Sequence, residues 1–174
     1  NNSLDVIKDS SDSIKEAPNN KELFDWIVKH GTAPWWYKAQ QSIQDIIETH
    51  LIHSEDFINN IIGEISQNSA TRKRVLWQWG ETGCKRIIEK LQPNHYDDIY
   101  KLIKEIHLIN RKLRVTSLDN AMFLGQLWQM VIEYLLCTQS TPFSIQALSN
   151  FIFGNLSDNY DHNHDVLVHR FSDE

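Results

Sequence analysis

The sequence contains little cysteine, glycine or proline and has no long hydrophobic run. Of its 174 residues, two are cysteine, six are glycine and four are proline. So little glycine and proline argues against a turn-rich all-β fold and favours helices. No apolar run approaches the roughly 18 residues that a membrane span needs, and no signal peptide is visible. We therefore expect no membrane span.

The cysteines and the missing catalytic motifs point away from enzyme chemistry. Cys84 and Cys137 form no CxxC pair, so neither a disulfide framework nor a thiolate zinc site is indicated. We expect both to be buried small hydrophobes in a reducing compartment. A glycine-rich phosphate loop, paired carboxylates in an apolar setting and a Gly-x-Ser-x-Gly elbow are all missing. We expect no enzyme activity, no catalytic residue and no cofactor.

Apolar residues recur at helical spacings of three and four through most of the chain. The predicted helices cover residues 21–30, 36–51, 54–65, 69–92, 95–114, 121–136 and 144–156, with a kink or break near Gly80. About seven helices without a convincing strand predict an all-α fold, either a multi-helix bundle or a short α-solenoid. The run 121–136 is apolar nearly all round, which is typical of a central helix.

The ends of the chain are polar. Residues 1–18 are rich in Ser and Asp and are predicted to form a flexible arm, and residues 157–174 are predicted to form a polar tail. Residues 19–156 then form a single all-α domain. Three boundary residues are predicted: Gly31 ends the first helix, Ser54 caps the third, and Ser117 or Thr116 caps the helix of 121–136.

The stretch GTAPWWY, residues 31–37, places three large aromatic residues after a glycine and a proline. Exposed tryptophans could stack on a ligand or on a partner's side chains. The alternative is a packed corner, in which Trp36 lies on the core face of the helix 36–51 and Trp35 covers the preceding helix. We adopt the packed corner, because the helical register aligns Trp36 with Ala39 and Ile43.

A second tryptophan pair lies in LWQWG, residues 76–80. Trp77 and Trp79 are two positions apart, about 200° around a helix, so a single face cannot bury both. One of them is expected to meet a second layer of helices or a partner protein. Together with the adjacent basic residues Arg72, Lys73 and Arg74, the two tryptophans form the predicted site of partner contact.

Charge is unevenly distributed along the chain. Residues 70–115 hold eleven Lys or Arg and five acidic residues, whereas the remainder holds six and eighteen. The basic residues lie on helix backs without interleaved aromatics, and the acidic remainder would repel a phosphate backbone. We therefore expect a solvated face or a charged patch that orients protein assembly, and no nucleic-acid binding.

The histidines raise the hypothesis of a metal-dependent enzyme, because imidazoles and carboxylates can ligate zinc or nickel. The residues concerned are His50, His53, His162, His164 and His169, with Asp161 and Asp165 beside the last group. No HExxH pattern is present, and a polar tail has little rigidity for a fixed ligand geometry. We expect no functional metal site.

The segment ELFDWIVKHGTAPWW resembles contractile injection system tape measure proteins, in which a short hydrophobic helix leads into a G-x-x-P-W-W corner. The order that follows is similar: a helix ending near Leu51, an aliphatic helix at 57–65 and the basic segment ATRKRVLWQ. The resemblance spans about residues 21–92. It supplies no catalytic residues, and its motif positions are structural markers: Gly31, Pro34, Trp35 and Trp36.

This resemblance implies a non-enzymatic component of a phage-tail-like contractile particle, from a family thought to set tube and sheath length during assembly. The implied partners are tube, sheath or baseplate proteins, and the implied location is the bacterial cytoplasm during assembly, within the particle. A protein that sets length by its own extension should be long and extended, whereas this sequence predicts a globular fold. We therefore expect the chain to be a globular segment of a larger tape measure polypeptide. The alternative is a helical-repeat module that binds a peptide or partner helix in a groove lined by Trp77 or Trp79.

Overall fold

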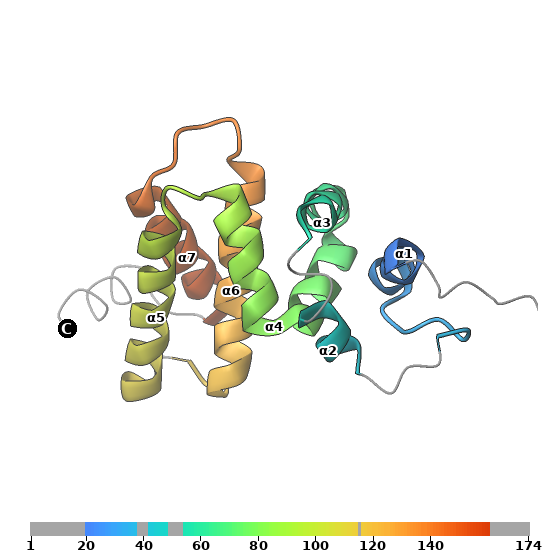
Figure 1. Cartoon of the computed structure of the whole chain (residues 1–174). Coiled ribbons are helices and arrows are strands. Elements are labelled where there is room, and N and C mark those ends of the chain that lie inside the picture. Colours follow the sequence, from blue (N-terminus) through green and yellow to red (C-terminus); the bar gives the residue numbers. More distant parts are fainter. Residues whose placement is uncertain (1–19, 38–41, 49–53, 115, 161–174) are drawn as a thin grey trace, which may run out of the picture. The chain divides into compact units, whose positions relative to one another are not determined.

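The computed structural model describes residues 20–37, 42–48, 54–114 and 116–160. Their helices are α1 (Asn20–His30), α2 (Ile43–Ile46), α3 (Glu55–Gln67), α4 (Ser69–Leu91), α5 (Tyr96–Leu113), α6 (Asn120–Cys137) and α7 (Ile145–Tyr160) (Figure 1). No strand occurs among these described residues, so the all-α prediction is confirmed. Contacts divide the chain into two units, Asn1–Lys38 and Ala39–Glu174, so a boundary falls inside the predicted domain of 19–156.

The first unit contains α1 and the turn that follows it. The predicted apolar face of α1 is buried: Leu23, Phe24, Ile27 and Val28. Gly31 ends the helix with a φ of 73°, a left-handed conformation that favours glycine. Its N–H donates to the carbonyl oxygen of Ile27 at 2.8 Å. The predicted role of Gly31 is therefore confirmed.

The prediction of a packed tryptophan corner is wrong for Trp35, which is 87% exposed. Trp36 is half-buried, and both tryptophans lie in a turn in which the N–H of Tyr37 donates to the carbonyl oxygen of Pro34 at 3.0 Å. This turn removes Trp36 from the helical register that the sequence predicted. The helix predicted over 36–51 is reduced to α2 in the part of it that the structure describes, since residues 38–41 and 49–53 lie outside that part.

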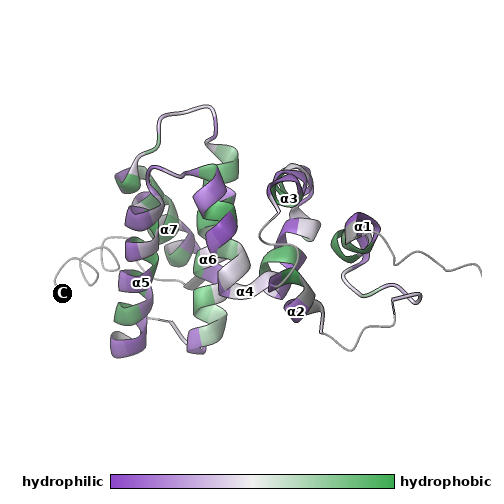
Figure 2. Ribbon diagram, in the orientation of Figure 1, coloured by the Kyte–Doolittle hydropathy of each residue, from purple (hydrophilic) through white to green (hydrophobic). Residues whose placement is uncertain are grey.

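In the second unit, α6 is the central helix and contacts α4, α5 and α7 (Figure 1). The nearly continuous apolar sequence of α6 predicted this position. Its buried side chains are Phe123, Leu127, Trp128, Met130, Val131, Ile132 and Leu135. Around α6, α5 shows hydrophobic and hydrophilic residues in alternation (Figure 2). In the second unit, α4, α5 and α7 therefore pack around α6, and α3 packs on α4.

The residue that caps α6 differs from the prediction. The Asp119 carboxylate accepts the N–H of Met122 at 2.9 Å, so Asp119 caps the helix instead of Thr116 or Ser117. Thr116 is buried, and its N–H donates to the side-chain oxygen of Asn110 at 2.9 Å. That bond places Thr116 in the connection after α5, before the first turn of α6.

α4 consists of two helical segments joined at Gly80 (Figure 1). Gly80 has a φ of 59° and a ψ of −161°, a conformation restricted almost entirely to glycine, so the predicted break is confirmed. The side-chain amide of Gln44 in α2 donates to the carbonyl oxygen of Trp79 at 3.3 Å. Beyond the break, Glu55 of α3 forms ion pairs with Arg86 and Lys90, each at 2.6 Å. The first contact therefore joins the segment before the break to α2, and the ion pairs join the segment after it to α3.

Several local predictions have mixed outcomes. The Ser54 hydroxyl caps α3, where it accepts the N–H of Phe57 at 3.4 Å, as predicted. Cys84 is buried as expected, but Cys137 at the end of α6 is exposed. α7 continues to Tyr160, past the predicted limit of 156. Among the residues described, none of the helices combines the length and hydrophobicity required to cross a membrane.

Candidate functional site

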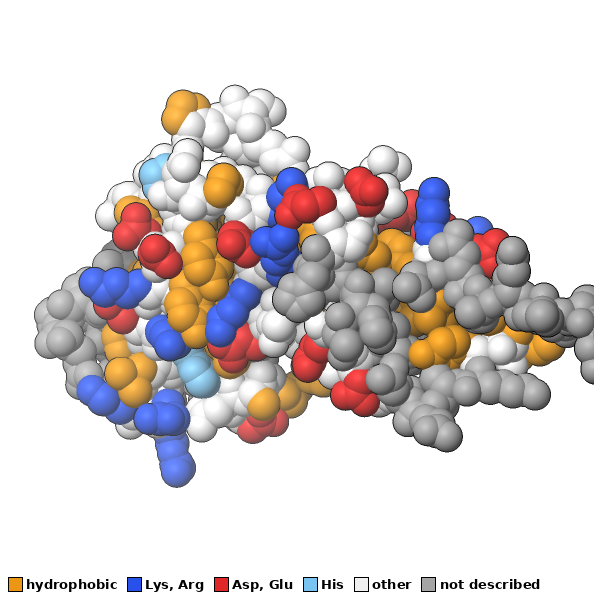
Figure 3. Space-filling view, in the orientation of Figure 1, with side chains coloured by type: hydrophobic (Ala, Val, Ile, Leu, Met, Phe, Trp, Pro, Cys, Tyr) orange, Lys and Arg blue, Asp and Glu red, His pale blue; other side chains and the backbone are white. Residues whose placement is uncertain are grey.

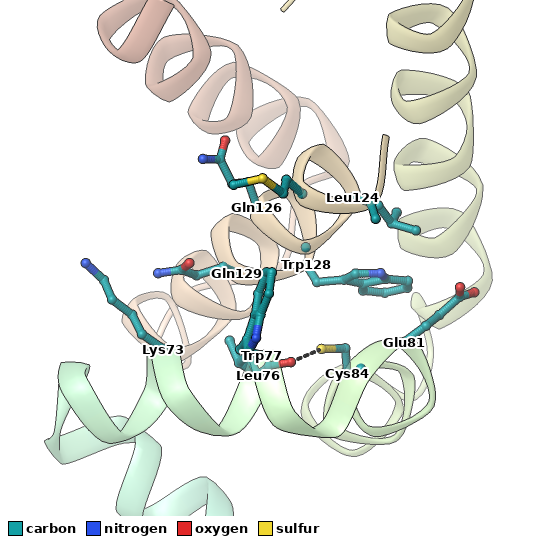
Figure 4. A pocket seen from close by; sticks show the side chains of 13 residues that line it. Lys73, Leu76, Trp77, Glu81, Cys84, Leu124, Gln126, Trp128 and Gln129 are labelled. Carbon is teal, nitrogen blue, oxygen red and sulfur yellow. Dashed lines mark hydrogen bonds between the residues drawn. The ribbon is translucent and has the colours of Figure 1, made fainter. Parts of the chain in front are cut away.

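A groove of about 400 Å³ lies between α4 and α6, within the second unit (Figure 4). The facing helix α6 lines it with residues that include Met122, Gly125, Trp128 and Gln129. α4 contributes Lys73, Leu76, Trp77, Gly80, Glu81 and Cys84. Lys73, Leu76 and Trp77 share one side of the first segment of α4, and the other three lie at the break or just beyond it. The groove therefore follows the seam between two helices.

The two tryptophans of LWQWG lie in opposite environments. Trp79 is 1% exposed and stacks on Phe57 of α3, with ring centroids 5.3 Å apart. Trp77 is 70% exposed and lines the groove (Figure 4). The prediction that one face cannot bury both is confirmed. Trp77 is the residue at the surface, and Trp79 belongs to the core and cannot line a binding surface.

Each tryptophan lies against a glycine. A Cβ added at Gly83 would lie 2.5 Å from the Cβ of Trp79, a separation that real side chains do not adopt. A Cβ added at Gly125 would lie 3.7 Å from Cζ3 of Trp77, an ordinary van der Waals distance. The Trp79 contact therefore requires glycine, whereas the Trp77 contact leaves room for a methyl group.

The three adjacent basic residues of the predicted site separate in space. The Arg72 side chain is 12% exposed and donates to the carbonyl oxygen of Ile65 at 2.9 Å and to Glu133 of α6 at 3.3 Å. Arg74 is half-buried. Lys73 is exposed, lines the groove and forms no ion pair with the residues that the structure describes. Of the three, Lys73 is the one that offers its charge at the groove.

Glu81, also at the groove, is already paired. Its carboxylate accepts from Lys85 at 2.6 Å and from the hydroxyl of Tyr100 at 3.3 Å. The hydrogen bond from Lys85 is the main reason that the pKa of Glu81 lies below its usual value. Lys85 and Lys104 also lie over the Tyr100 ring, with their Nζ atoms 4.4 and 4.6 Å from its centroid. The negative charge of Glu81 is thus balanced within the chain.

Cys84 lines the groove but is not poised for chemistry. Burial, with a smaller contribution from the charge of Glu81, raises the pKa of the thiol to about 12. The thiol is therefore protonated at neutral pH, and a protonated thiol is a poor nucleophile. Its Sγ donates to the carbonyl oxygen of Leu76 at 3.8 Å (Figure 4). Cys84 is a packing residue of the groove.

The remaining candidates from the sequence are the histidines considered as metal ligands and the basic segment 70–115. His50, His53, His162, His164 and His169 lie outside the described residues. Within the part of the chain that is described, no group of three or more His, Cys, Asp or Glu side chains is placed to hold a metal ion.

Lys and Arg side chains over α4 and α5 lie beside Asp and Glu side chains (Figure 3). Ion pairs such as Lys101 with Glu105, at 3.8 Å, partly neutralise this basic region.

Comparison with known protein families identifies the chain. The model of the contractile injection system tape measure protein family matches residues 1–173. The chain belongs to this family. No curated protein and no solved structure gives a match. The tape measure family match covers much more of the chain than the resemblance over 21–92.

Sequence reasoning found the α4 side of the groove and missed the α6 side. Spacing and charge together single out five residues: Trp77, Trp79, Arg72, Lys73 and Arg74. Of these, two line the groove, Trp77 and Lys73. Spacing and charge do not single out Met122 and Gly125, because their part in the groove depends on how α6 packs on α4. The available signal was Gly125 itself, a glycine in the interior of a largely apolar helix.

Proposed function

We propose that this tape measure family chain is a non-enzymatic assembly module of a phage-tail-like contractile particle and contributes to setting the length of the tube and sheath. The family match over residues 1–173 carries this proposal. The groove supports it, because Trp77 and Met122 expose large hydrophobic side chains of the kind found at protein contacts. The partners are tube, sheath or baseplate proteins, and the chain acts in the bacterial cytoplasm during assembly.

We further propose that the chain acts by docking to the tube or baseplate. A protein that measures length by its own extension must be long, and a helix rises about 1.5 Å per residue. The central helix α6 has 18 residues and is packed into a bundle. Contact with a growing assembly suits such a bundle better than spanning the particle does. The alternative of a module that binds a peptide or partner helix is compatible with this role, since docking requires a binding surface.

The proposal is tested by deleting the gene in the bacterium that encodes it and counting and measuring particles by negative-stain electron microscopy. We expect deletion to abolish particles or to alter their length distribution, and the wild-type gene to restore both. Particles of unchanged number and length in the deletion strain would contradict the proposal.

A further inference from the structure

The groove has the composition of an anchoring site for a large apolar side chain. Trp77 and Met122, at its rim, are 70% and 44% exposed. Its floor includes Leu76 and Trp128, which are 6% and 3% exposed. An exposed aromatic residue above a buried apolar floor is typical of the residues that dominate binding energy at interfaces. The groove volume of about 400 Å³ suffices for a few side chains.

The charged residues at the groove indicate which sign of charge its ligand carries. Lys73 lies one helical turn before Trp77 on the same side of α4, and Lys73 and Gln129 lie on the same side of the Trp77 ring (Figure 4). Glu81 is balanced by Lys85 at 2.6 Å. The uncompensated charge is therefore positive, and it is complementary to a carboxylate placed about one turn from the anchoring side chain.

The walls of the groove determine the form of the ligand. Both walls are helical and neither contains a strand, so neither wall offers a strand edge to an extended peptide. A helix laid along such a seam presents side chains at spacings of three and four, which match the spacing of Lys73, Trp77 and their neighbours. A ligand helix can thus place an apolar side chain and a carboxylate together.

We propose that the groove binds an amphipathic, acidic helix of another protein of the particle. The helix inserts a large apolar side chain beside Trp77 and places a carboxylate, one turn away, on Lys73. This inference rests on the proposed function in one respect, which is that the helix is sought among the tube, sheath and baseplate proteins.

A second copy of this chain is a poorer match for the groove. Leu108 on α5 is 42% exposed and could serve as an apolar anchor. Its neighbours at three and four positions are Lys104, Arg111 and Lys112, with the single carboxylate Glu105. This helix would bring net positive charge to Lys73, so charge favours a different, acidic partner.

The test uses overlapping synthetic peptides of about 20 residues, long enough for several helical turns, that cover the tube, sheath and baseplate proteins encoded with this chain. Binding of each labelled peptide to the purified full chain is measured by fluorescence anisotropy. We expect binding by peptides that combine an apolar stripe with a carboxylate. Trp77→Ala and Lys73→Glu should each weaken binding about tenfold or more.

Two controls isolate the groove. Lys101→Glu changes the charge of the chain by the same amount as Lys73→Glu at a position that does not line the groove, and should leave binding unchanged. Replacing the peptide carboxylate with lysine should restore binding to the Lys73→Glu variant. Circular dichroism establishes that each variant is folded before its binding is compared.

The inference is overturned if no peptide binds, if the bound peptides are basic, or if binding is indifferent to both Trp77→Ala and Lys73→Glu. Self-association that is measured by sedimentation equilibrium and lost in Trp77→Ala would overturn it in favour of a second copy. Failure of the proposed function is separate, since it is read from particles in the deletion strain. Peptide binding with unaffected particles would support the groove and contradict the role in assembly.

Discussion

The two faces of α4 differ in how a tryptophan meets a glycine. On one face, Trp79 is buried against Phe57, and an added Cβ at Gly83 would lie only 2.5 Å from its Cβ. On the other, Trp77 is exposed over Gly125, where an added Cβ would lie 3.7 Å away. The first arrangement is complete within the chain, whereas the second leaves an aromatic surface open. Residues of the same type, two positions apart, thus serve the fold and, as we propose, an outside contact.

The largest effect is expected when the buried tryptophan is removed. Trp79→Ala should lower the free energy of unfolding by about 3–5 kcal/mol, because it leaves a cavity between α3 and α4. Trp77→Ala is the matched control and should change it by less than about 1 kcal/mol. Both are measured by urea denaturation. Equal destabilisation by the two variants would remove the contrast between the two faces.

A smaller loss is expected from adding one methyl group on the buried face. Gly83→Ala should lower the free energy of unfolding by about 1–3 kcal/mol, since Trp79 must move to admit it. Gly63→Ala is the control, because an added Cβ at Gly63 in α3 has no neighbour within 4 Å. A Gly83→Ala protein as stable as the wild type would show that the contact is not tight.

The same substitution on the open face should have the opposite sign. Gly125→Ala is expected to raise the free energy of unfolding by about 0.5–1 kcal/mol, because alanine is favoured over glycine within helices and the new methyl group has room beneath Trp77. Thermal unfolding of Gly125→Ala beside Gly83→Ala measures the contrast directly. A destabilised Gly125→Ala variant would mean that Trp77 is held as tightly as Trp79.

The smallest effect concerns the ion pairs between α3 and α4, on the side of Trp79. The hydrogen bond from Lys90, helped by Arg86, holds the pKa of Glu55 below its usual value. A carboxyl group with a lowered folded-state pKa stabilises the fold above its unfolded pKa, and this stabilisation is lost as the pH falls through the folded pKa.

Melting temperatures of the wild type and Glu55→Gln should therefore differ slightly at pH 7 and converge as the pH falls below about 4. The exposed position of Glu55 keeps the difference small and sensitive to salt. A gap that stays constant from pH 7 to about pH 3 would show that the carboxylate charge does not contribute.

Helical periodicity predicted most of the fold, because the core of the second unit is built from faces with regular spacing. It predicted the central position of α6, while the break at Gly80 was predicted from the two glycines that interrupt the helix. It failed at Trp35, because the turn between Pro34 and Tyr37 sets the local chain direction and periodicity carries no information about turns. It also failed to single out Asp119 as the cap of α6, since Thr116 and Ser117 have the same capping chemistry.

The groove was only half predictable for a related reason. Arg72 and Lys73 are adjacent in the sequence and carry the same charge. Arg72 nevertheless forms an ion pair with Glu133 of α6, whereas Lys73 lines the groove at the surface. That choice depends on the packing of α6 against α4, which sequence spacing does not specify. The spacing indicated that a single face cannot bury both Trp77 and Trp79, whereas which of them is exposed, and beside which neighbours, did not follow from it.

The most direct test replaces the wild-type gene with Trp77→Ala and measures particle number and length by electron microscopy, after the variant is shown to be folded and present at the wild-type level. We predict fewer particles or an altered length distribution, because the open face of α4 makes the contact that assembly requires. Particles that match the wild type in number and length, from cells with a folded Trp77→Ala chain, would contradict this role.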